Sequence, residues 1–162
     1  MFSIGDRIVY PMHGAGIIEA IEEKQILGEL REYYILRIPV GDMKIMIPCD
    51  STDCVGVREI IDKRQLRVVE IALRGDSTEM SGNWNRRYRD NMDKLKTGDL
   101  KCVCEVVRNL MRADRVKKLS SGEKKMLMNA KQILISELIL VSSRDETDLV
   151  TFIEKLVHGE NI

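Results

Sequence analysis

Hydrophobic and polar positions divide this chain into two stretches with different periods. Up to about residue 48, apolar residues come in short runs rich in β-branched side chains, some of them alternating with polar residues, which is typical of strands. The predicted strands span residues 6–10, 17–22, 33–39 and 43–48. From residue 62 the apolar positions recur every three or four residues, which indicates helices. The pattern therefore predicts a strand-rich part followed by a helical part.

Turn signals separate the predicted strands. Pro11 cannot donate a ladder hydrogen bond and ends the first strand, while Gly14 and Gly16 open the second. Gly28 and Gly41 mark two further turns. Four or five short antiparallel strands within about 45 residues are typical of a small SH3- or Tudor-like β-barrel.

Start and stop signals divide the helical part. Gly75 ends the first helix, residues 77–82 form a polar linker, and the helix that starts near Trp84 runs to about residue 97. Later helices are expected to begin at capping residues. These are Asp99, then Ser120 with Glu123 at capping-box spacing, then Ser143 with Glu146 at the same spacing before a last helix at about residues 145–157.

These patterns predict an α+β protein with two domains. Residues 1–60 form the small antiparallel barrel and residues 61–162 form the all-helical domain. The helix after Ser120 is apolar on most of its later circumference, so it is expected to be the central core helix. A length of 162 residues with 44% hydrophobic content is enough for two small cores.

Candidate membrane, metal and catalytic signals are weak. No apolar run reaches the roughly 18 residues of a membrane span, and the first residues lack a signal-peptide pattern, so a soluble cytoplasmic protein is expected. Cys49 and Cys54 lie in a loop-like stretch, while Cys102 and Cys104 are two apart in a helix and point to different faces. No CxxC motif occurs, and His13 is far from the second histidine, so neither a metal nor a cofactor is expected.

The glycine-rich segment at residues 14–16 does not predict catalysis. It is too short for a dinucleotide-binding fingerprint and precedes a strand instead of a helix, so it is interpreted as a turn in which a side chain would clash. The adjacent His13 has no nucleophile or acid placed to work with it and is interpreted as structural. A binding protein without enzymatic activity or small-molecule substrate is therefore expected.

Charge is distributed unevenly although the chain is formally neutral, with 26 basic and 26 acidic residues. Residues 1–60 carry 6 Lys/Arg against 10 Asp/Glu, and residues 132–162 carry 2 against 6. Residues 86–131 carry 14 Lys/Arg against 6 Asp/Glu, a balance of +8. A basic middle between acidic ends indicates a polyanion-binding face on one part of the molecule, although a solvated helix surface has the same composition.

Trp84, the single tryptophan, lies between Asn83 and Asn85, with three arginines in the next five residues. A core tryptophan usually has apolar neighbours at helical spacing, whereas here the apolar positions resume only at Tyr88. A surface ring beside cations is suited to stacking on nucleic acid or wedging into it. The alternative is a half-buried ring that packs a helix N-terminus while the arginines are merely solvated. The pattern does not separate the two.

With both parts described, the chain resembles the CarD/CdnL family of bacterial transcription regulators. The matching blocks occur in family order along nearly the whole chain. They are GDRIVYP at 5–11, HGAG at 13–16, EYYIL at 32–36, VGVR at 55–58, NWNRRYR at 83–89, KLKTGD at 94–99, LS at 119–120 and GEKKML at 122–127.

The resemblance implies a two-site regulator. In such proteins the Tudor-like domain docks on the β subunit of RNA polymerase, and a related domain occurs in the transcription-repair coupling factor. The helical domain contacts promoter DNA, with little sequence specificity, at the upstream edge of the melted bubble. There the tryptophan wedges into the minor groove. The family thereby alters the lifetime of the open complex, typically at ribosomal RNA and other growth-linked promoters.

Residue by residue, the resemblance and the charge pattern give two sets of candidates. The DNA-binding set is Trp84, Arg86, Arg87, Arg89, Lys124 and Lys125, and the polymerase-binding set is Lys24 and Met46. Some family members carry an arginine where this chain has Met46, which puts a salt bridge there in doubt but leaves a strand edge that could pair. Two alternatives remain open, a freestanding nucleic-acid-binding module and a protein adaptor with a Tudor-like barrel.

Overall fold

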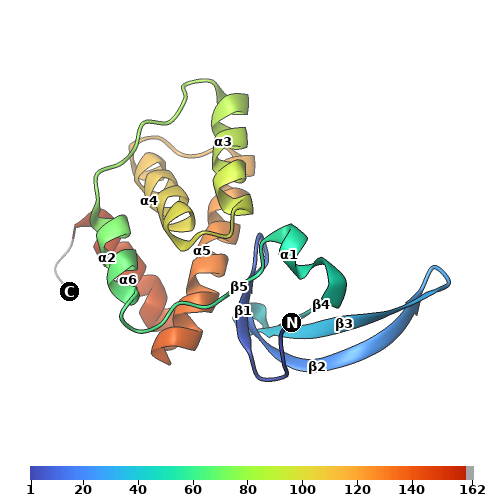
Figure 1. The fold of residues 1–162 in the computed structure, drawn as a ribbon. Helices are drawn as coiled ribbons and strands as arrows, with labels where there is room; N and C mark the ends of the chain where they lie inside the picture. Colours follow the sequence, from blue (N-terminus) through green and yellow to red (C-terminus); the bar gives the residue numbers. More distant parts are fainter. Residues whose placement is uncertain (160–162) are drawn as a thin grey trace.

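A five-stranded antiparallel sheet forms the N-terminal part of the computed structural model, which describes residues 1–159 apart from the side chains of residues 53 and 54. Cys54 therefore lies outside the described side chains. The strand order is β4-β3-β2-β1-β5, with β4 and β5 at the two edges (Figure 1). The strands are β1 (Arg7–Tyr10), β2 (Gly14–Ile26), β3 (Glu29–Ile38), β4 (Met43–Pro48) and β5 (Arg58–Glu59), with the short helix α1 (Thr52–Val55) before the last.

The β2–β3 hairpin extends away from the helices as a two-stranded arm (Figure 1). Its turn is the Leu27-Gly28 pair, and both residues have positive φ, 53° and 80°, as a two-residue hairpin turn with the twist of the flanking strands requires. Both strands are longer than the predicted 17–22 and 33–39. Residues 21–32 are exposed on both faces of the arm, so they lack the alternation that sequence reasoning depends on.

Inside the sheet, alternate residues of neighbouring strands form a small core. Tyr34 and Leu36 of β3 are fully buried, and they pack with Ile8, Ile18 and Ile47. The Gly14-Ala15-Gly16 segment lies within β2, where a side chain would clash as the sequence predicts. A Cβ at Gly14, whose φ is 117°, would lie 2.7 Å from the Ser136 hydroxyl oxygen. At Gly14 the clash is therefore with helix α5 (Ser121–Ser142), whereas a Cβ at Gly16 would meet the backbone of Arg37 in the neighbouring strand β3.

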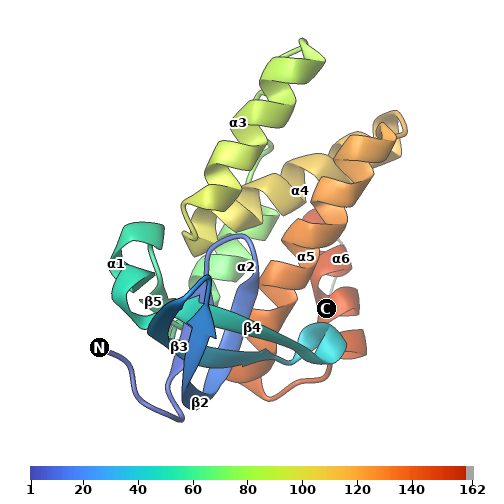
Figure 2. The same cartoon turned by 90° about the vertical axis from the view of Figure 1, so that its right-hand side faces the viewer.

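Five helices make up the C-terminal part and confirm the predicted α+β fold (Figure 2). The long helix α5 is the centre of this core, with Leu134 and Leu138 fully buried against α4. Among the described residues, no single helix is long and apolar enough to cross a membrane, although α5 and α6 reach that composition together across a 113° bend. The helices are α2 (Leu66–Arg74), α3 (Trp84–Lys96), α4 (Leu100–Val116), α5 (Ser121–Ser142) and α6 (Glu146–His158).

Two predicted N-caps are confirmed and one is wrong. Asp99 accepts a hydrogen bond from the Cys102 amide, and Ser120 accepts one from the Glu123 amide. Ser143 does not cap α6: it lies in the left-handed conformation that ends α5. Asp145 takes the N-cap role, because its carboxylate is the group placed to accept the Asp148 amide.

Sheet and helices meet at α5, which lies against β2 (Figure 2). Glu137 of α5 is 2% exposed and accepts two hydrogen bonds from the Arg58 guanidinium, each 2.8 Å long, and one of 2.9 Å from the Ile61 amide. At the preceding residue, the Ser136 hydroxyl accepts a hydrogen bond from the Ala15 amide of β2 at 2.8 Å. The bonds of Arg58 and Ala15 join the sheet to α5, so the junction is fixed by directional contacts.

Replacing Glu137 by alanine is expected to destabilise the protein by about 3 kcal/mol, because the change leaves Arg58 without its buried partner. Urea unfolding at neutral pH measures this loss. Glu59→Ala serves as the control, because Glu59 is an exposed carboxylate beside Arg58 in β5, and it should change stability by less than about 0.5 kcal/mol. Equal stability of the two variants would show that the ion pair does not hold the junction.

Candidate nucleic-acid interface and sheet face

The N-termini of α3 and α5 come together at one end of the helical part. Trp84 is the first residue of α3, and Ser120 is the N-cap of α5. The indole Nε1 of Trp84 donates to the Ser120 hydroxyl oxygen at 2.9 Å. Helix N-termini carry partial positive charge and free amide groups, so two of them side by side favour an anion such as phosphate.

Trp84 is a surface residue with one supported face. Its ring stacks on that of Tyr88 with centroids 5.1 Å apart and an interplanar angle of 18°. The side chain nevertheless remains 41% exposed, unlike a core tryptophan. This geometry excludes a core tryptophan, but it agrees with both interpretations of the sequence, because the half-exposed ring lies beside cations and also packs against the N-terminus of α5.

Arg87 differs from the other candidate phosphate contacts because its guanidinium has partners within the protein. Its guanidinium forms a two-pronged ion pair with Glu123, with Nε–Oε2 of 2.9 Å and Nη2–Oε1 of 3.0 Å, and also donates to the Ser81 carbonyl. Glu123 is 3% exposed, so this pair is an internal brace between α3 and α5. Three of its five N–H donors are used in these bonds, and no local pattern predicts this because Arg87 and Glu123 are 36 residues apart.

The other four basic candidates are exposed around the paired helix ends. Arg86 and Arg89 lie in the first two turns of α3, and Lys124 and Lys125 lie in the first two turns of α5. None of these four forms an ion pair with another described side chain. They are therefore available for an anionic partner.

Sequence reasoning missed Lys117 and Lys118. Both are exposed in the α4–α5 connection, and they line a hollow of about 790 Å³ together with Trp84. The apolar walls of the hollow include Met80 and Leu119. The excess of basic residues at 86–131 was the available signal, but nothing local marked these two lysines as neighbours of the tryptophan.

The two candidate polymerase contacts lie on one face of the sheet. In the strand register Lys24 pairs with Arg31 and Met46 pairs with Ile35, and Arg31 and Ile35 are an even number of residues apart on β3. Paired residues share a face, and so do residues two or four apart along one strand. Lys24 forms an exposed ion pair with Glu22 at 3.1 Å, while Met46 lies 41% exposed on the edge strand β4. Arg31, which the sequence analysis did not select, belongs to the same face.

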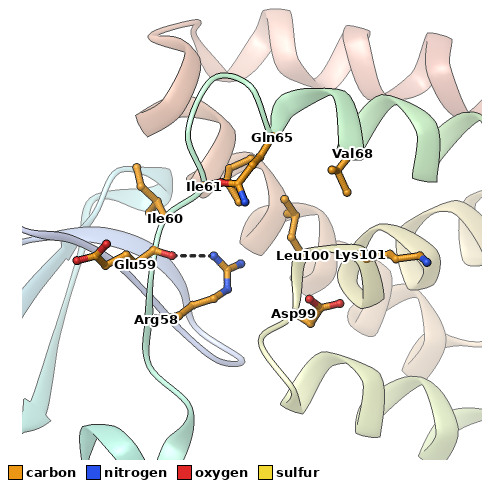
Figure 3. Close-up of a pocket in the computed structure, with 9 residues that line it drawn as sticks. All are labelled: Arg58, Glu59, Ile60, Ile61, Gln65, Val68, Asp99, Leu100 and Lys101. Atoms are coloured by element: carbon orange, nitrogen blue, oxygen red, sulfur yellow. Dashed lines mark hydrogen bonds between the residues drawn. The ribbon is translucent and has the colours of Figure 1, made fainter.

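A separate pocket of about 320 Å³ lies where the β5 segment meets α2 and α4 (Figure 3). Arg58 forms part of its wall and donates to the neighbouring Glu59 carbonyl, as the dashed line shows (Figure 3).

Among the described residues no group of three or more His, Cys, Asp or Glu side chains could hold a metal ion. His13, in the loop before β2, stacks on Tyr10 with a centroid distance of 4.6 Å.

The Arg87–Glu123 pair is expected to make stability depend on pH. The hydrogen bond from Arg87 holds the pKa of Glu123 below its ordinary value of 4.5, against the opposing effect of burial. A depressed folded-state pKa contributes stability at pH above about 4.5, and this is lost as pH falls through the lower folded value. Urea unfolding should therefore give a higher free energy of unfolding for wild type than for Glu123→Gln at pH 7, and this difference should narrow toward pH 3. A difference that stays constant with pH would contradict an ionic brace.

Comparison with known proteins gives two family matches and two similar proteins. The family described as CarD-like/TRCF RID domain matches residues 2–61, and the family described as CarD, C-terminal domain matches residues 67–154. A Bacillus subtilis (strain 168) protein, the candidate transcription factor YdeB, is 45% identical over 153 residues, 94% of this chain and 99% of its own length. The solution structure of the 72-residue N-terminal domain of Myxococcus xanthus CarD is 29% identical over 36% of this chain and 79% of its own, with a TM-score of 0.32.

The two family matches together span most of the chain in the order expected from its motifs, and the relative from Bacillus subtilis is similar over nearly its full length. Such families are transcription-associated factors that interact with RNA polymerase. The chain belongs to the CarD/CdnL family of transcription regulators.

Proposed function

We propose that this protein binds the β subunit of RNA polymerase through its sheet and promoter DNA through the paired N-termini of α3 and α5. At the upstream edge of the melted bubble, Trp84 would wedge into the minor groove and alter the lifetime of the open complex at ribosomal RNA and other growth-linked promoters. The observation that carries this proposal is a single half-exposed tryptophan among four exposed cations at two helix N-termini, none of which forms an ion pair within the described part of the chain.

Charge and geometry support a DNA contact with little sequence preference. Arg86, Arg89, Lys124 and Lys125 can reach phosphates, which position a protein on DNA without reading bases. A protein held on polymerase needs only modest affinity for DNA, because tethering supplies a high effective concentration. This agrees with a formal net charge of zero for the whole chain.

The energetic effect on transcription follows from a difference between two DNA states. Inserting a ring between intact base pairs must first offset the cost of unstacking them. At the bubble edge that unstacking has already occurred, so the stacking gain falls selectively on melted DNA. The protein can therefore shift the equilibrium toward the open complex only by that difference.

Trp84→Ala is expected to leave polymerase binding intact and to shorten the open-complex lifetime by about five- to a hundredfold. That range corresponds to about 1–3 kcal/mol of base–aromatic stacking. The measurement is the decay of heparin-resistant complexes on a ribosomal RNA promoter, with thermal unfolding of the variant beside it. Because the ring is half-exposed, the variant should lose far less stability than a core truncation would. A stable variant with a wild-type lifetime would exclude the wedge.

Binding of the full chain to duplex DNA should weaken steeply with salt. Four phosphate contacts correspond to a slope of about −3.6 in a plot of log K against log salt. Alanine at Arg86, Arg89, Lys124 or Lys125 should each reduce the slope by about one, whereas Lys63→Ala, an exposed residue before α2, should not. Strong discrimination between unrelated duplexes would point instead to a sequence reader, and a slope near zero would point to a protein adaptor.

Polymerase docking should depend on the sheet face that carries Lys24 and Met46. Lys24→Glu and Met46→Glu are each expected to weaken binding of the full chain to the β subunit, without DNA, by about tenfold. Arg115→Glu, a charge reversal at an exposed position of α4, is the matched control. Pulldown or calorimetry with a β-subunit fragment tests this. Tight DNA binding by a chain that binds no polymerase would favour the freestanding nucleic-acid module.

A further inference from the structure

We infer that the first turn of α5 is a positioning device for Trp84: the Ser120 hydroxyl and the Cα of Gly122 hold the indole in one orientation before any DNA is bound. This inference rests on the proposed role of Trp84 in DNA contact and adds two residues that act through it. Neither residue needs to touch nucleic acid.

The contacts fix the ring along one edge and one face. Nε1 donates to the Ser120 oxygen at 2.9 Å, and the Tyr88 ring supports the face of the indole. The Cζ2 and Cη2 atoms lie against Gly122, where an added Cβ would approach to 3.3 and 3.7 Å. Nε1, Cζ2 and Cη2 belong to the same edge of an indole. The opposite edge is therefore left out of these contacts, on a side chain that stays 41% exposed.

Ser120 is itself held in place. Its hydroxyl accepts the Glu123 amide at 3.3 Å as the N-cap of α5 and lies 3.3 Å from the Glu123 carboxylate oxygen Oε1. Glu123 in turn is fixed by its ion pair with Arg87, which comes from the same helix as Trp84. The indole acceptor thus belongs to a closed network between α3 and α5, and its position does not depend on a mobile side chain.

Gly122→Ala offers a test in which the open-complex lifetime should fall while the stability of the protein does not. Alanine is favoured over glycine within a helix, so Gly122→Ala should not destabilise the protein. Its methyl group would nevertheless press on the indole, so the variant should shift the ring and shorten the open-complex lifetime by about two- to tenfold. Gly82→Ala is the matched control, because a Cβ there meets nothing within 4 Å.

Trp84 is the only tryptophan, so its fluorescence reports the orientation of this ring in the free protein. Gly122→Ala and Ser120→Ala should both shift the emission to longer wavelength and lower its anisotropy, while Gly82→Ala and Ser120→Thr, which keeps the hydroxyl, should match wild type. Unchanged emission in both test variants would overturn the inference without reference to DNA or polymerase.

A double-mutant cycle separates positioning by Ser120 from its capping role. Trp84→Phe keeps an aromatic ring but removes the N–H donor. Ser120→Ala should shorten the open-complex lifetime about two- to tenfold when Trp84 is present, the size of one hydrogen bond, and should have no effect in the Trp84→Phe background. Loss of the cap lowers thermal stability equally in both backgrounds and so cannot mimic this result.

The outcomes distinguish the inference from the function on which it rests. If Trp84→Ala shortens the lifetime but Ser120→Ala and Gly122→Ala do not, the DNA contact stands and the positioning role is wrong. If Trp84→Ala leaves the lifetime unchanged, the proposed function fails, and the fluorescence of the free variants still decides whether the first turn of α5 orients the ring. Equal effects of Ser120→Ala in both backgrounds would reduce Ser120 to a helix cap.

Discussion

The ion pair between Arg58 and Glu137 sets the geometry between the sheet and the helices. Glu137 lies 2% exposed in the last two turns of α5, where an unpaired carboxylate would be costly, and the Arg58 guanidinium and the Ile61 amide donate to it. Such a pair adds little net stability compared with apolar packing, but it demands one orientation. The sheet is therefore held at a defined position on α5, the helix whose first turn also contacts Trp84.

The chain has no net charge, but its exposed cations are concentrated around the N-termini of α3 and α5. The cations around the start of α3 and α5 act together with two helix N-termini, while Arg87, which belongs to the same run of sequence, is withdrawn to brace Glu123. The same segment thus divides its arginines between holding the surface together and presenting charge. Local composition gives only the number of arginines, and the contact of Arg87 with Glu123 in the fold distinguishes the bracing arginine from the exposed ones.

Much of the architecture was predictable because strong local signals agreed with the tertiary structure. The change of period near residue 62, Asp99 and Ser120 as caps, and α5 as the core helix all follow from sequence pattern. Ser143 failed as a cap because spacing alone does not reveal its left-handed backbone. The Ser120 contact with Trp84 and the lysines at 117 and 118 depend on residues more than 30 positions apart, for which one sequence carries no signal.

The tight Leu27-Gly28 turn limits how the length of the hairpin arm can vary. Because the loop contains only two residues, Lys24 faces Arg31, and the pairing continues in the same register along the arm until the shift between Ile18 and Ala20. Removing one residue from each strand would carry the side chains at the tip to the opposite face, since successive residues of a strand alternate. Removing two residues from each strand would shorten the arm and return the side chains at the tip to their original face. Related chains that keep this surface should therefore differ in arm length by multiples of four residues.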